Sequence, residues 1–132
     1  MAHPFHVHTG LTIESAANGV ARLRLPWKPE HSQDQGVLQG GYLAMLADAA
    51  VHTAADSLGK PGEILTTIEL KTNFLGPVRG QGVVAEASIV KRGRTIVLGE
   101  VTLKTDSGEL VGKSLVTYMI LAPRQGLPGS PS

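Results

Sequence analysis

The sequence contains no cysteine, few aromatic residues and no long apolar run. Without cysteine the chain can form neither disulfides nor thiolate metal sites, and it has no thiol nucleophile. It contains no uninterrupted apolar stretch of about 18 residues, so the sequence predicts no transmembrane helix and no membrane partner. No apolar segment near Met1 resembles a secretion signal, and we therefore expect a cytoplasmic protein.

The chain also lacks an excess of charge of either sign. Its 12 basic and 11 acidic residues are distributed along its length, and the formal net charge is +1. Because nucleic-acid-binding domains usually carry a strong basic excess, we expect no nucleic-acid partner. A chain of 132 residues is long enough for one domain, which a second subunit would stabilise further. We expect this domain over residues 1–121 and a disordered Pro-, Gly- and Ser-rich tail over 122–132.

One segment has strong helical periodicity. After Gly40 and Gly41, apolar residues recur at helical spacing from residue 42 to about residue 57, which predicts one long amphipathic helix. Asp48 does not fall on the polar side of this helix but on the flank of its apolar stripe. A carboxylate in that position is either solvated at the helix edge or part of a functional site.

Strand patterns occur on both sides of the helix, with turn-rich links between those that follow it. These links predict that the later strands are antiparallel neighbours. A long helix before several strands, without β-α alternation, is typical of an α+β fold in which a curved antiparallel sheet wraps around a central helix. The expected strands are 11–15, 20–25, 65–75, 83–91, 95–105 and 109–121, after a flexible terminus over residues 1–9.

The start of the helix has the features of a carbonyl-binding site. Gly40 and Gly41 leave backbone N–H groups free at the positive end of the helix dipole, with no side chain to exclude a ligand oxygen. Gln33, on the loop before the helix, adds an amide that can orient water or a carbonyl group. These residue types predict a site that polarises a carbonyl group.

The segment Gln-Asp-Gln-Gly-Val-Leu-Gln-Gly-Gly at 33–41, followed by Asp48, resembles the motif of a known family. This family comprises the hotdog-fold acyl-CoA thioesterases of the phenylacetic-acid-degradation (PaaI-like) type. The resemblance continues through residues 66–77, 91–95 and 106–111. It implies a hotdog fold, hydrolysis of an acyl-CoA or aryl-acyl-CoA, no cofactor, and sites at a dimer interface, often within a tetramer.

The resemblance also implies roles for individual residues. Asp48 is the expected catalytic acid residue, either as general base or as nucleophile, and the Gly40 N–H is the expected carbonyl polariser. Gln33 would orient the carbonyl group or the water. Thr67 lies where the family often has Ser or Thr beside its acidic residue, although threonine is also an ordinary strand residue. Gln39 departs from the family, which usually has histidine there.

Several residues are candidates for substrate binding rather than for catalysis. Gln39, Gly41 and His52 are placed around the helix in positions that suit contact with the substrate. Asp48, His52 and Asp56 follow one another at helical spacing like half of a metal site, but no second cluster supplies the other ligands. We therefore expect no metal.

Basic residues in two turns are candidates for contact with the phosphates of CoA. Phosphate recognition favours clustered Arg and Lys, although many charged hairpin tips are only solvated. The candidates are Arg79, Lys91, Arg92 and Arg94.

The spacing of Gly40 and Asp48 predicts the oligomeric state. Eight helical residues span about 12 Å along the axis, which is too far for both groups to act on one carbon atom. Two antiparallel helices in a symmetric dimer would bring the start of each helix beside the middle of the other. We expect a homodimer of this kind, assembled into a tetramer as the resemblance implies.

Two other functions remain open at this point. Gln39 replaces the usual histidine, so the chain could instead be a non-catalytic acyl-CoA-binding protein. A hotdog hydratase or dehydratase is less well supported, because it would need a catalytic histidine near the helix start.

Overall fold

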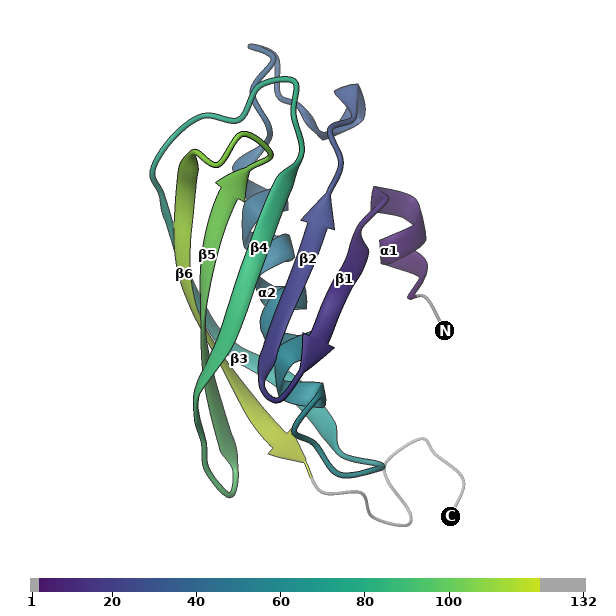
Figure 1. The fold of residues 1–132 in the computed structure, drawn as a ribbon, viewed down its shortest axis with the longest axis vertical. Coiled ribbons are helices and arrows are strands. Elements are labelled where there is room, and N and C mark those ends of the chain that lie inside the picture. The colour runs from purple at the N-terminus through teal and green to yellow at the C-terminus, as the bar shows by residue number, and fades with distance from the viewer. Residues whose placement is uncertain (1–2, 122–132) are drawn as a thin grey trace.

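The computed structural model describes residues 3–121 (Figure 1). The tail expected to be disordered over residues 122–132 lies outside the described residues. The strands lie close to their expected positions, and the elements are α1 (Pro4–Thr9), β1 (Thr12–Ala17), β2 (Val20–Leu25), a 3-10 turn (Pro29–His31), α2 (Gly40–Asp56), β3 (Ile64–Phe74), β4 (Val83–Arg92), β5 (Ile96–Thr105) and β6 (Leu110–Leu121).

The strands form one six-stranded sheet in the order β1-β2-β4-β5-β6-β3, and every neighbouring pair is antiparallel. Figure 1 shows the sheet curving around α2, which lies against one of its faces. This arrangement confirms the predicted α+β fold with a central helix. No helix of the described part of the chain is long and apolar enough to cross a membrane.

The apolar stripe of α2 packs closely on the sheet. Leu46, Ala50 and Ala54 are completely buried. The sheet approaches the helix most closely at Gly99 of β5, where a Cβ atom would lie only 2.6 Å from Cγ1 of Val51. Real Cβ atoms essentially never make so short a contact, so glycine at 99 permits this approach. This packing fixes the rotation of α2 and therefore the direction of Asp48.

The strand order corrects one expectation. We expected β3 and β4 to be neighbours because their link is short, but β3 pairs with β6 at the edge of the sheet. Residues 75–82 cross the end of the sheet instead (Figure 1). The link is held there by the buried Val78, whose carbonyl oxygen accepts the N–H of Leu38 at 2.9 Å. As a result, β3 has one edge that pairs with no other described strand.

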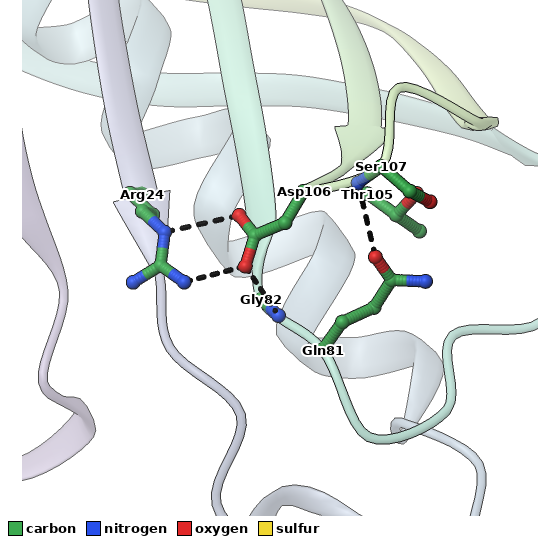
Figure 2. Close-up of polar contacts among 6 residues, drawn as sticks. All are labelled: Arg24, Gln81, Gly82, Thr105, Asp106 and Ser107. Atoms are coloured by element: carbon green, nitrogen blue, oxygen red, sulfur yellow. Dashed lines mark hydrogen bonds and ion pairs between the residues drawn. The ribbon is translucent and has the colours of Figure 1, made fainter.

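A network of polar contacts holds the end of this link against the sheet (Figure 2). Arg24 of β2 binds both carboxylate oxygens of Asp106, at 3.0 and 2.5 Å, and Asp106 also accepts the N–H of Gly82 at 3.1 Å. The hydrogen bond from Arg24 holds the pKa of the Asp106 carboxyl below its usual value. Gln81 accepts the N–H of Ser107 at 3.0 Å. These contacts fix the last residues of the β3–β4 link, just before β4 begins.

The expectation of a flexible N-terminal segment is wrong for residues 4–9, which form α1. Pro4 lies in the first turn, where its missing N–H costs nothing. The helix ends at Gly10, which has a left-handed φ of 81° and donates its N–H to the His6 carbonyl at 2.9 Å. His6 and Thr9 are buried. Burial of these two side chains holds α1 against the rest of the fold, an effect that local sequence pattern does not reveal.

Candidate active site

A cavity of about 450 Å³ lies beside the middle of α2. Five elements contribute to its walls, so it depends on the whole fold and not on one motif. Its apolar lining consists mainly of Phe5, Ile13, Met45, Ala49 and Leu65, and its polar lining of His3, His6, Asp48, His52, Thr53, Asp56, Thr67 and Tyr118.

The carboxylate of Asp48 is held on one side only. Thr67 of β3 donates its hydroxyl to Oδ1 at 2.9 Å, and the Tyr118 hydroxyl of β6 donates to the same oxygen. Tyr118 also donates to the backbone oxygen of Asp48 at 2.8 Å. No described residue donates a hydrogen bond to Oδ2. One oxygen is therefore anchored, and the other is free to accept a proton or to attack a carbon atom.

Tyr118 is a candidate site residue that sequence reasoning missed. It lies directly opposite Thr67 in the β3–β6 register and is only 2% exposed. Burial, followed by the hydrogen bond to the Asp48 carboxylate, holds the pKa of the Tyr118 phenol far above its usual value, so it remains a donor. The alternation of β6 could have indicated that Tyr118 points inward. Only the unexpected pairing of β3 with β6 puts it beside Thr67.

The start of α2 is open, as expected from its glycines. The N–H groups of Gly40 and Gly41 donate to no acceptor among the described residues. A Cβ atom at Gly41 would meet nothing within 4 Å, whereas one at Gly40 would lie 3.2 Å from the Phe74 ring. Gln39 is the N-cap residue, is exposed, and its side chain makes no capping hydrogen bond. Two backbone donors are thus accessible to a ligand oxygen.

Gln33 lies in the turn before α2 and is exposed. Its side-chain oxygen accepts the N–H of Gln35, and its own N–H donates to the Val37 carbonyl at 2.8 Å. Neither Gln33 nor Gly40 lines the cavity that contains Asp48. One chain therefore does not bring the expected polarising groups and the expected base together.

The turn before α2 is packed on a buried histidine. The ring of His31 lies 4.3 Å from that of Tyr42, and the His31 carbonyl accepts the N–H of Gln39 at 2.9 Å. Burial, followed by the charge of Lys28, holds the pKa of the His31 imidazole below its usual value. Its Nδ1 atom is buried without a hydrogen-bond partner in the described residues. A neutral His31 thus supports the start of α2.

His52 lies in the wall of the cavity, one turn after Asp48. Its Nδ1 atom is 3.5 Å from Oδ2 of Asp56, and its ring is 5.7 Å from that of Tyr118. Burial, followed by the neighbouring His3 and His52, holds the pKa of the His6 imidazole below its usual value. No group of three or more metal-ligating side chains suited to an ion occurs among the described residues.

The basic candidates lie at two ends of the sheet. Arg79 donates to the Gln35 carbonyl at 3.2 Å, near the start of α2. The length of β4, about 30 Å for its ten residues, separates Arg79 from the hairpin with Lys91 and Arg94 (Figure 1). Arg92 forms a half-buried ion pair with Glu63 at 2.5 Å. One chain does not gather these residues into a single cluster.

Comparison with known proteins identifies the family. Residues 35–112 match the family model of the thioesterase superfamily. A candidate esterase of Halobacterium salinarum is 36% identical over 101 residues, which cover 73% of this chain and 66% of that protein, just under two thirds of its length. Human acyl-coenzyme A thioesterase 13 is 26% identical over 107 residues, which cover 78% of this chain and 74% of that enzyme.

Similarity to solved structures indicates the same family. A solved structure of a variant of the phenylacetic acid degradation protein PaaI from Thermus thermophilus has a TM-score of 0.82 and 26% identity, and the match covers 90% of this chain and 100% of that one. The matched family segment runs from the turn before α2 into β6 and contains both Asp48 and Thr67. The predicted hotdog fold and the predicted kinship with thioester hydrolases are confirmed, and this chain belongs to the thioesterase superfamily.

Proposed function

We propose that this protein is an acyl-CoA thioesterase that hydrolyses an acyl-CoA or aryl-acyl-CoA to the free acid and CoA. The observation that carries this proposal is the Asp48 carboxylate, which lines a cavity with one oxygen anchored and the other free. The name of the human relative, an acyl-coenzyme A thioesterase, supports the substrate class.

The chemistry assigns Asp48 one of two roles. As general base, it takes a proton from water while the water oxygen attacks the thioester carbon; the C–S bond then breaks, and the thiolate leaves and is protonated. As nucleophile, it forms an acyl anhydride with release of the thiolate, and water then hydrolyses the anhydride. In both routes the Gly40 N–H donates to the carbonyl oxygen and stabilises its negative charge.

The proposed site is shared between two subunits. Gly40 and Asp48 lie at the start and in the middle of the same helix, about 12 Å apart along its axis. A homodimer with antiparallel α2 helices places Gln33 and Gly40 of one subunit beside Asp48 and Thr67 of the other. The absence of Gln33 and Gly40 from the walls of the Asp48 cavity in one chain supports this arrangement.

The free edge of β3 supports the same dimer. This 11-residue strand is long for an unpaired edge, and Ile68, Leu70 and Phe74 are 49%, 38% and 57% exposed. Long apolar edge strands are normally paired or covered, because their free N–H and C=O groups invite aggregation. Pairing of β3 with its symmetry mate satisfies these backbone groups and covers the exposed apolar side chains. The new interface then lies next to Gly40, because the Phe74 ring packs close to this glycine. Exposed Ile96 and Met119, paired on the outer sheet face, support a further step to the tetramer.

The remaining candidates receive roles in substrate binding. Gln39 and Gly41 border the carbonyl, and His52 contacts the acyl group in the cavity. In an antiparallel dimer, the Arg79 end of one subunit lies near the β4–β5 hairpin of the other, so Arg79, Lys91, Arg92 and Arg94 are proposed contacts of the CoA phosphates. Arg92 must exchange its ion pair with Glu63 to take part.

The test is hydrolysis of a panel of acyl-CoAs, measured with a thiol reagent. We expect thiol release by the native protein and a decrease in kcat of about 10²- to 10⁴-fold in Asp48→Asn, the usual worth of a general base. Glu86→Gln is a control, because it removes an exposed carboxylate on β4 that does not line the cavity. Binding of acyl-CoA without release would support the acyl-CoA-binding protein instead. A folded Asp48→Asn protein with native activity would contradict the assignment of Asp48.

A further inference from the structure

We infer that Tyr118 is a positioning residue, whose hydroxyl holds the Asp48 carboxylate so that Oδ2 faces the substrate cavity. This inference rests on the proposed function, in which Asp48 reacts with the substrate or with water. Tyr118 lies beyond residues 35–112, the part of the chain that the family model matches.

The contacts of Tyr118 fix the side chain of Asp48 relative to α2. The hydroxyl donates both to the backbone oxygen of Asp48, at 2.8 Å, and to its Oδ1 atom. One donor placed between the backbone and the carboxylate of the same residue restricts the rotation of the side chain about its first bond. The carboxylate therefore keeps one orientation before substrate binds.

Tyr118 can do this because its own position is rigid. Its side chain is 2% exposed, and its strand is paired on both sides, with β3 and with β5. Its ring also packs against that of His52 in a T-shaped arrangement, with the ring centres 5.7 Å apart. A phenol on a rigid ring reaches a defined point, because the distance from the backbone to the oxygen is fixed by covalent geometry.

Thr67 and Tyr118 act on the same oxygen and leave the other one free. Thr67 donates to Oδ1 at 2.9 Å, so both donors stabilise negative charge at Oδ1. Oδ2 receives no hydrogen bond from any described residue, and it is the atom that can accept a proton or attack the thioester. Because burial keeps the pKa of Tyr118 above its usual value, the phenol stays protonated and continues to donate.

The first test is Tyr118→Phe, which keeps the ring and removes only the hydroxyl. We expect kcat to fall about 10- to 100-fold, the range for loss of one hydrogen bond to a charged group. KM should change less than about twofold, because the hydroxyl is bonded to Asp48 rather than aimed at the substrate. A folded Tyr118→Phe protein with native kcat would overturn the inference.

A double-mutant cycle separates positioning from a general structural effect. In the Asp48→Asn protein, Tyr118→Phe should cause no further loss of the residual activity, because there is no carboxylate left to position. Equal losses in both backgrounds would overturn the inference and indicate a structural role. If the native protein releases no thiol from acyl-CoA, the proposed function fails, and if Asp48→Asn alone keeps native activity, the assignment of Asp48 fails. Both outcomes differ from a Tyr118→Phe protein that keeps native kcat while Asp48→Asn is impaired.

A spectroscopic measurement keeps the inference testable if Tyr118→Phe does not fold. The chain has two tyrosines, so fluorotyrosine in a Tyr42→Phe background reports on Tyr118 alone. We expect its ¹⁹F resonance to shift when Asp48 is replaced by Asn and to stay in place when Glu86, an exposed carboxylate on β4 outside the cavity, is replaced by Gln. Equal resonance positions in the Asp48 variant and its parent would contradict the contact on which the inference rests.

Discussion

Asp48 and Thr67 show what can be read at the scale of single residues. Thr67 was expected beside the acidic residue from the resemblance alone, and its hydroxyl lies 2.9 Å from Oδ1 of Asp48. Tyr118 makes a second contact with the same oxygen but belongs to no recognisable motif. A residue inside a matching motif was therefore expected beside Asp48, whereas Tyr118, outside the motifs, was not.

A substitution of Gln39, the residue before Gly40, tests whether this residue acts through its side chain. Its side chain is exposed and makes no capping hydrogen bond, and the proposed carbonyl contact comes from a backbone N–H. We therefore expect Gln39→His, which restores the usual family residue, to change kcat/KM by less than about tenfold, or about 1.4 kcal/mol. A hundredfold gain would show that the native protein is a weakened enzyme and would favour the acyl-CoA-binding function.

At the scale of elements, α1 has a larger role than its sequence indicated. It was expected to be a flexible terminus, yet it is a helix that contributes Phe5 and His6 to the cavity wall. A six-residue helix is too short to be stable alone, so only its burial against other elements holds it. The wall of the cavity thus depends on a segment that local propensity did not identify.

Phe5 and Val7 test this role of α1 as a matched pair. Both are exposed apolar residues of the same helix, but only Phe5 lines the cavity. We expect Phe5→Ala to raise KM for acyl-CoA about 3- to 30-fold, because it removes apolar contact with the acyl group. Val7→Ala should leave KM unchanged. Steady-state kinetics measure both, and equal effects of the two changes would argue against α1 as a wall of the acyl site.

The turn before α2 should make stability depend on pH. Burial holds the pKa of His31 below its usual value, so the folded protein binds a proton there less readily than the unfolded chain does. The free energy of unfolding should therefore fall as the pH falls below about 6.5, the ordinary pKa of histidine. His31→Phe, which can still pack on Tyr42, should reduce this pH dependence of stability. Part of the pH dependence should remain, because the pKa of His6 is also lowered.

Urea unfolding at pH 7.5 and pH 5.5 measures the effect. The difference in unfolding free energy between the two pH values should be smaller for His31→Phe than for the native protein. An unchanged difference would show that His31 does not contribute to acid sensitivity.

At the scale of the whole molecule, the proposed reaction needs two subunits. Asp48→Ala damages one half of a shared site, and Gln33→Ala damages the other half. When the two variants are unfolded, mixed and refolded together, about half of the dimers should be mixed, and each of these contains one intact and one doubly damaged site. About a quarter of all sites should then be native, and hydrolysis should rise to roughly a quarter of the native rate.

The comparison requires that subunits mix, which tagged chains and affinity capture can establish. Refolding each variant alone is the control, and both should remain far less active than the mixture. If mixed dimers form and activity stays at the level of the single variants, Asp48 and Gln33 do not serve a shared site.

The sequence by itself determined helix α2, the strands and the place of Asp48. Helix α2 and the strands have strong local periodicity, and the helical spacing that puts Asp48 on the flank of an apolar stripe does not depend on distant residues. The tertiary structure decided that β3 pairs with β6, that Tyr118 meets Asp48, and that α1 lines the cavity. These outcomes depend on which surfaces pack across long sequence separations, and local patterns do not encode such pairings.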